Sequence, residues 1–147
     1  MKKAGSFKFS HFGICVSNLE SSIKFYEVAL GFTRGECYES GNEIESLLEL
    51  RQVDQRAQWM HHHSGIVIEL LYYISPVAIG DRRKLPHNKI GFTHMAFFVN
   101  DLHQAIAKIT ENGGFVRAET MTKLGNCTLV SCTDPDGVAI GLMQQTS

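Results

Sequence analysis

Two histidines and one glutamate stand out as side chains that could bind a metal ion together. His11 lies in FSHFGICV, His94 in FTHMAFFV and Glu69 in GIVIELLYY, so each sits among apolar residues. A carboxylate between apolar neighbours is costly unless a cation or a proton neutralises it. Two imidazoles and one carboxylate form a set that binds divalent metals and leaves coordination positions open for water or substrate. These residue types therefore point to a metal site with room for catalysis.

An internal repeat explains how residues so far apart in the chain could occupy equivalent places. A shift of 83 residues lays 9–36 on 92–119 without a gap; nine of the 28 pairs are identical, including His11 with His94. A second shift of 72 lays GIVIEL at 65–70 on GVAIGL at 137–142 and pairs Glu69 with Gly141. Repeated sequence predicts repeated structural units. The two histidines should therefore occupy the same position in two modules.

The elements that position these residues follow the order βαβββ in each module. Apolar or alternating runs at 7–16 and 91–99 predict strands, and helical spacing follows each. Ser17, with Glu20, and Asn100 are the predicted helix caps. Three more strands are predicted in each module, at 32–39, 44–50 and 65–74, then at 115–121, 127–133 and 137–144.

The predicted fold is therefore α+β, with two tandem βαβββ modules forming a curved, partly closed mixed sheet around a central pocket. The whole chain, 1–147, is expected to be one domain, with module one at 7–74, a linker at 75–90 and module two at 91–145. Alternate residues of a strand share a face, and helices must cover one face of each sheet. His11, Glu69 and His94 would meet if the two uncovered faces lie opposite each other. The same parity makes three other residues candidate substrate contacts: Tyr73, Phe98 and Met143.

The histidine tract at 61–63 has a functional and a structural interpretation. It immediately precedes the strand with Glu69 and could supply a further metal ligand. A solvated loop is favoured, because adjacent residues cannot all face one site. The surrounding segment, 52–64, is longer than its counterpart in module two, and with Trp59 it could form a lid over the pocket.

Charged residues permit two further interpretations. The cluster at 81–84, DRRK, could hold an anionic substrate group, although a solvated linker is favoured. Arg34 and Arg117, which the repeat pairs, are expected to form structural ion pairs with Glu36 and Glu119.

Composition limits the classes of partner. Fourteen basic and fifteen acidic residues give a formal charge of −1, so no strong field favours nucleic acid or an anionic membrane. No stretch approaches the ~20 apolar residues needed to cross a bilayer. The four cysteines form no C-x-x-C pair and are expected to be reduced. We therefore expect a cytoplasmic protein with a small-molecule substrate and with neither nucleic acid nor membrane as partner.

The chain resembles the vicinal oxygen chelate superfamily, which includes glyoxalase I, methylmalonyl-CoA epimerase, extradiol dioxygenases and fosfomycin-resistance thiol transferases. The resemblance covers nearly the whole chain and rests on FSHFGICVSNLESSIKFYEVALGF, GIVIEL, GFTHMAFFVNDLHQAIAKI with NGGF, and DPDGVAIGL. It implies metal ligands on the first, fourth, fifth and eighth strands, which here are His11, Glu69, His94 and Gly141. Members with a full site usually have a carboxylate at the last position, so Gly141 leaves the fourth ligand vacant.

The resemblance implies a metal-dependent lyase, isomerase, dioxygenase or transferase whose small substrate chelates the ion through vicinal oxygens. Imidazole and carboxylate ligands suit Fe²⁺, Mn²⁺, Zn²⁺ or Ni²⁺. Glu69 could also act as a base, but proton transfer on both sides of the substrate would need a second glutamate. One alternative is a metal-free protein that sequesters small molecules, like the bleomycin resistance proteins; another is a vestigial site in a domain that only assembles with partners. A homodimer is expected by resemblance, with the site either within one chain or shared between two.

Overall fold

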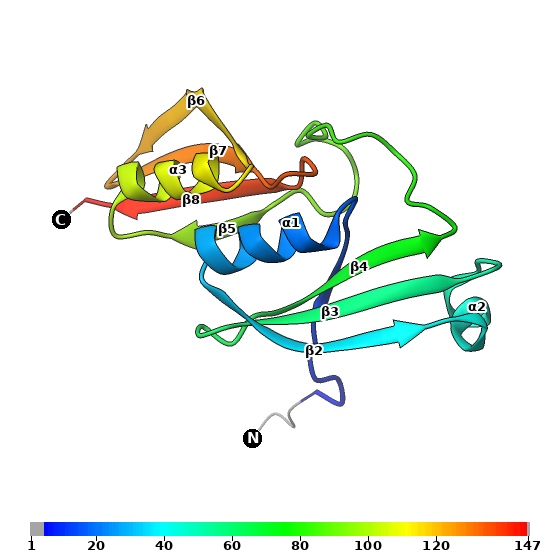
Figure 1. Cartoon of the computed structure of the whole chain (residues 1–147). Helices are drawn as coiled ribbons and strands as arrows, with labels where there is room; N and C mark the ends of the chain where they lie inside the picture. Colours follow the sequence, from blue (N-terminus) through cyan, green and yellow to red (C-terminus); the bar gives the residue numbers. More distant parts are fainter. Residues whose placement is uncertain (1–4, 147) are drawn as a thin grey trace.

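The computed structural model describes residues 5–146 and contains two four-stranded sheets (Figure 1). The first has the order β1-β4-β3-β2 and the second β5-β8-β7-β6; in each, the two strands named first are parallel and the other pairs antiparallel. The strands are β1 (Phe12–Cys15), β2 (Phe32–Ser40), β3 (Asp54–His62), β4 (Val67–Ser75), β5 (Met95–Phe98), β6 (Phe115–Leu124), β7 (Cys127–Thr133) and β8 (Ala139–Gln145). The predicted α+β fold with two tandem βαβββ modules is confirmed, and the sheets do not close into a barrel.

The main helices lie between the sheets and contribute to one shared core (Figure 1). In module one, α1 (Leu19–Lys24) continues into the π-helical segment η1 (Phe25–Ala29), which packs against α3 (Leu102–Glu111) of module two. No helix within residues 5–146 is long and apolar enough to span a bilayer. Both sheets contribute to the core: Phe32, Met60, Ile68 and Leu70 from the first, and Val130, Cys132, Ile140 and Leu142 from the second.

The side chains between these core residues point away from the helices, because successive strand residues alternate in direction. We call these two sides the open faces. Gly13, Cys15, Trp59, Glu69, Leu71 and Tyr73 belong to the open face of the first sheet, and Ala96, Phe98, Ser131, Gly141 and Met143 to that of the second.

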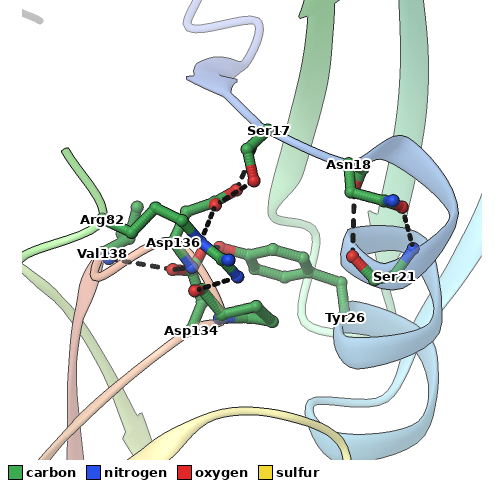
Figure 2. Close-up of polar contacts among 9 residues, drawn as sticks. Ser17, Asn18, Ser21, Tyr26, Arg82, Asp134, Asp136 and Val138 are labelled. Atoms are coloured by element: carbon green, nitrogen blue, oxygen red, sulfur yellow. Dashed lines mark hydrogen bonds and ion pairs between the residues drawn. The ribbon is translucent and has the colours of Figure 1, made fainter. Parts of the chain in front are cut away.

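Both helices begin one residue later than predicted. The caps are Asn18 and Asp101, whose side-chain oxygens each accept a hydrogen bond of 3.0 Å from the backbone N–H three residues further on. The predicted caps, Ser17 and Asn100, are therefore wrong. Ser17 is engaged elsewhere, since its backbone N–H and its hydroxyl both donate to the carboxylate of Asp136 (Figure 2).

The segment predicted as a strand at 44–50 is helical instead. It forms a 3₁₀ turn, η2 (Asn42–Ile44), and a short helix, α2 (Glu45–Leu48). The Glu45 carboxylate accepts hydrogen bonds from two backbone N–H groups beyond the helix, and Glu49 ends the helix with a φ of 55°. The third strand of the module is β3, inside the segment interpreted as an inserted loop. Its glutamine, arginine and histidine residues conceal the strand pattern in the sequence.

A one-residue offset separates the two modules after their first helices. The helical segment of module one, α1 with η1, is one residue longer than α3, because a π-helical turn accommodates an extra residue. The shift of 72 residues relates Met60 on β3 to Cys132 on β7. Arg34 on β2 lies opposite Met60, and Val116 on β6 lies opposite Cys132. Arg34 therefore corresponds in space to Val116 and not to Arg117.

The offset gives the two arginines different surroundings. Arg34 Nε donates to Glu27 Oε1 at 3.0 Å, so Arg34 forms a structural ion pair, and its partner is Glu27. Arg117 lies opposite Ser131, whose side chain belongs to the open face of the second sheet. Within the described part of the chain, the buried Arg117 Nε has no hydrogen-bond partner.

A polar network joins module one, the linker and the turn before β8 (Figure 2). The Tyr26 hydroxyl donates to Asp134 Oδ2 at 2.9 Å, while Asp134 Oδ1 accepts two backbone N–H groups of its own turn. Asp136 accepts hydrogen bonds from Ser17 and from Arg82 of the linker. Tyr26 and Asp134 are fully buried, and burial raises the pKa of both side chains. The network therefore fixes the modules relative to each other.

Removing the Tyr26 hydroxyl should destabilise this junction. Tyr26→Phe removes the hydrogen bond to Oδ2 of the buried Asp134, and we expect the free energy of unfolding to fall by about 1–3 kcal/mol. Urea denaturation at neutral pH measures the loss. Tyr38→Phe is the matched control, because the exposed Tyr38 hydroxyl contacts only Glu36 at the surface, and its effect should stay within about 0.5 kcal/mol. Equal denaturation midpoints for the two variants would contradict a structural role for the network.

Candidate metal centre

His11 and Glu69 meet at the end of the first sheet. His11 immediately precedes β1, and Glu69 on β4 lies opposite Gly13. His11 Nε2 is 2.9 Å from Glu69 Oε2, and the two side chains are 30% and 19% exposed. Two atoms that bind one ion at about 2.1 Å, roughly at right angles, lie about 3 Å apart. The separation of the pair therefore matches that of two ligands of one divalent ion.

Each candidate histidine is oriented by the residue before it. Ser10 Oγ lies 2.8 Å from His11 Nδ1, and Thr93 Oγ1 lies 2.8 Å from His94 Nδ1. Metal-binding histidines commonly use one ring nitrogen in such a hydrogen bond, which fixes the ring and leaves the other nitrogen for the metal. In both imidazoles the hydrogen bond engages Nδ1 and not Nε2, and Nε2 is the atom by which His11 contacts Glu69.

Trp59 supports the first histidine. It lies opposite Glu69 on the neighbouring strand β3, and its ring centroid is 4.5 Å from that of His11. The predicted lid at 52–64 is therefore wrong, because Trp59 belongs to a sheet and packs beside the candidate ligands.

His94 occupies the equivalent place on the second sheet, beside Gly141. A Cβ atom at Gly141 would lie 3.8 Å from His94 Cδ2 and 3.7 Å from Ala96 Cβ, which are ordinary contact distances. A carboxylate side chain at this position would therefore approach His94 as Glu69 approaches His11.

One chain does not bring His94 together with His11 and Glu69. Within residues 5–146, no three histidine, cysteine, aspartate or glutamate side chains are placed to hold a metal ion. The layer order explains the separation: the sheets turn their helix-covered sides toward each other, so the two open faces point outward.

The second sheet has a cavity of about 280 Å³ beside His94. Gly141, Ser131 and Thr120 line it, together with His87 of the linker. The His87 and His94 ring centroids are 5.7 Å apart. The sequence analysis did not single out His87, since it lies outside the repeat and outside every predicted element.

His62, in the middle of the histidine tract, lies on the helix-covered side of the first sheet, whereas His61 shares the open face with Trp59. His62 packs between the modules, with its ring centroid 5.0 Å from Phe32 and 6.0 Å from Phe97. Burial and the neighbouring His63 lower the pKa of His62. These contacts favour a structural role for His62.

Three predicted substrate contacts lie on the open faces, further along the strands than the candidate ligands. Tyr73 on β4 lies opposite Gln55, and Phe98 on β5 lies beside Met143. Cys15 shares the face of Glu69, but burial, with a smaller effect of Asp136, raises the pKa of its thiol. The thiol should therefore stay protonated at neutral pH and be a poor nucleophile.

Comparisons with known proteins agree with this architecture. A glyoxalase family protein from Bacillus cereus is 23% identical, with 100% of this chain and 99% of that chain covered and a TM-score of 0.85. Glyoxalase I from Zea mays is 20% identical, with 93% and 44% covered and a TM-score of 0.66, so this chain spans less than half of it. The fosfomycin resistance protein of Listeria monocytogenes, solved with Mn(II) and sulfate, is 17% identical, with 95% and 93% covered and a TM-score of 0.59.

These structural likenesses show the fold alone. Among curated proteins, a sequence search finds no match. The family model of the Glyoxalase/Bleomycin resistance protein/Dioxygenase superfamily, however, matches residues 8–142, which is nearly the whole chain. The protein therefore belongs to the glyoxalase/bleomycin resistance protein/dioxygenase superfamily.

Proposed function

We propose that the protein is a divalent-metal-dependent enzyme of this superfamily, a lyase, isomerase, dioxygenase or transferase whose small substrate chelates the ion through vicinal oxygens. The observation that carries the proposal is the 2.9 Å separation of His11 Nε2 and Glu69 Oε2, with His94 in the equivalent place of the second module. His11, Glu69 and His94 would hold the ion.

The donor set fits a transition metal. Two neutral imidazoles and one carboxylate suit Fe²⁺, Mn²⁺, Zn²⁺ or Ni²⁺, and Mn(II) is the ion in the Listeria protein. The bound ion would supply Lewis acidity toward the substrate oxygens. With a single carboxylate ligand, the site would have a net charge of about +1, which favours anionic or strongly polar oxygens over neutral apolar groups.

Glu69 is the residue we propose as base. Its carboxylate lies among Gly13, Trp59 and Leu71, an environment that excludes water from one side and leaves the other open. Position 141 provides no second carboxylate, so proton transfer would occur on one side of the substrate only. Tyr73, Phe98 and Met143 would contact the apolar part of the substrate.

A homodimer would complete the site. A second copy could place the open face of its second sheet over the open face of the first sheet, and symmetry would then create two identical sites. Exposed aromatic side chains support this arrangement, because Phe9, Phe92 and Phe98 are 65%, 93% and 69% exposed. Phe9 and Phe92 both lie close to Phe12, with ring centroids 4.9 and 5.8 Å from it, and contiguous exposed apolar groups mark interaction surfaces. We place the enzyme in the cytoplasm, which the four free cysteines support.

Metal analysis of the purified protein tests the proposal. We expect one divalent ion per chain by elemental analysis, and His11→Ala or His94→Ala should each weaken its binding by at least ~100-fold in a calorimetric titration. His103→Ala, an exposed histidine on α3, is the matched control and should bind the ion like the wild type.

An activity screen with the ion so identified would then reveal the reaction. A protein that binds no ion, but binds a planar aromatic compound tightly, would contradict the proposal. It would instead be a sequestering protein that resembles the bleomycin resistance proteins.

A further inference from the structure

We infer that His87 is a metal ligand that takes the place of the carboxylate missing at Gly141. The inference rests on the proposed function, because it adds a fourth ligand to the set of His11, Glu69 and His94. His87 and His94 would come from one chain, and His11 and Glu69 from its symmetry mate.

The distance between the two rings is compatible with a shared ion. In a metal–imidazole bond of about 2.1 Å, the ring centroid lies roughly 3.2 Å from the ion, so two rings on one ion have centroids up to about 6 Å apart. The centroids of His87 and His94 are 5.7 Å apart. This centroid distance corresponds to a wide angle between the two metal–nitrogen bonds. A small movement of the turn that contains His87 would reduce the angle.

The cavity contains no competing ligand. Apart from His87 and His94, its lining consists of threonine, serine, glycine and aliphatic residues: Thr120, Thr122, Leu124, Leu129, Val130, Ser131, Ile140 and Gly141. Imidazole is a common ligand of divalent transition metals, whereas aliphatic side chains are not ligands at all. The two histidines are thus the groups by which this cavity would hold an ion.

The backbone presents His87 at a defined place. A hydrogen bond of 3.1 Å from the Lys89 N–H to the Pro86 carbonyl closes a turn with His87 at its second position. Across the cavity, Gly141 has no side chain, which leaves room for an imidazole. A glutamate at 141 would occupy this room, so a histidine from the linker and a carboxylate from β8 are alternative ways to complete the site.

Substitution of His87 tests the inference. His87→Ala should weaken Zn²⁺ or Mn²⁺ binding by at least ~100-fold in a calorimetric titration, since even loss of an outer-shell partner costs 10–100-fold. The double variant His87→Ala/Gly141→Glu should recover most of the lost affinity, because a Cβ atom at position 141 meets only ordinary contacts and the new carboxylate supplies a ligand beside His94. His103→Ala is again the control.

A spectroscopic measurement separates a ligand from a residue that acts indirectly. Pulsed electron paramagnetic resonance of the Cu²⁺-loaded protein counts coordinated imidazoles, and we expect three in the wild type and two in His87→Ala. Because His87 is exposed in a linker, the substitution should leave the circular dichroism spectrum unchanged.

Two outcomes would overturn the inference in distinguishable ways. If His87→Ala binds the ion like the wild type while His94→Ala does not, His87 is not a ligand and the proposed function stands. If neither variant loses affinity, the inference and the proposed metal site both fail.

Discussion

Glu69→Gln is expected to abolish the thermal stabilisation that a divalent ion gives the protein. At a free ion concentration of ~100 times the dissociation constant, the wild type should gain about 2.7 kcal/mol of stability. In a domain of this size that gain raises the melting temperature by roughly 5–10 °C. The variant keeps the size of the side chain and a hydrogen-bond acceptor for His11, but it lacks the charge that the ion requires.

Without metal, the same variant should be at least as stable as the wild type. Glu69 is 19% exposed, lies in an apolar strand and has one contact, with the His11 ring, so its charge is only partly compensated there. Thermal melts with and without the ion measure both effects. Glu111→Gln, at the exposed end of α3, should show the full wild-type shift. An equal shift in Glu69→Gln would exclude Glu69 as a ligand.

Two inactive variants should together restore a metal site, because each copy would contribute half of it. In a heterodimer of Glu69→Gln with His94→Ala, one site carries both defects and the other carries neither. We expect about one ion per two chains when such a heterodimer is isolated through two different affinity tags. A homodimer of either variant alone should bind essentially no ion tightly, so the heterodimer would regain a site that both parent proteins lack.

The matched control pairs two defects in the same module. A heterodimer of Glu69→Gln with His11→Ala has one defect in each site and should bind no ion tightly. If the first mixture also fails to bind while the wild type does, the site lies within one chain, and a rearrangement of the modules must bring His94 to His11.

The sequence predicted the fold well because two independent signals coincided. Runs rich in aromatic and β-branched residues, at 7–16 and 91–99, contain His11 and His94, and the repeat places both runs at the same position of a module. Each signal specifies β1 or β5 without knowledge of the partner strand. By contrast, β3 has polar residues on both sides, and Gln58 uses its side chain to bind backbone carbonyls of β2. No periodicity in the sequence reports such contacts.

The candidate site was predictable only in part. Strand parity identifies the face on which a side chain lies, and it placed Glu69 and Gly141 on faces without helices. The alternation of side chains does not specify which face of one sheet packs toward the other sheet. The order of the sheets and helices depends instead on packing around Tyr26 and Ile109 in the shared core. His87 was missed for a different reason, because a linker residue has neither a repeat partner nor an alternating neighbour to reveal its direction.

Because of the extra residue in η1, the two open faces that would form the proposed shared site carry different side chains at spatially corresponding positions. Arg117 reaches the open face of the second sheet, while the spatially corresponding position in module one, one residue out of step with the repeat, is Gly35. A substrate held between the two faces would therefore meet a cation at one end only. Such a polarity would favour one of the two head-to-tail orientations of a bound molecule, although the scaffold that holds it is duplicated.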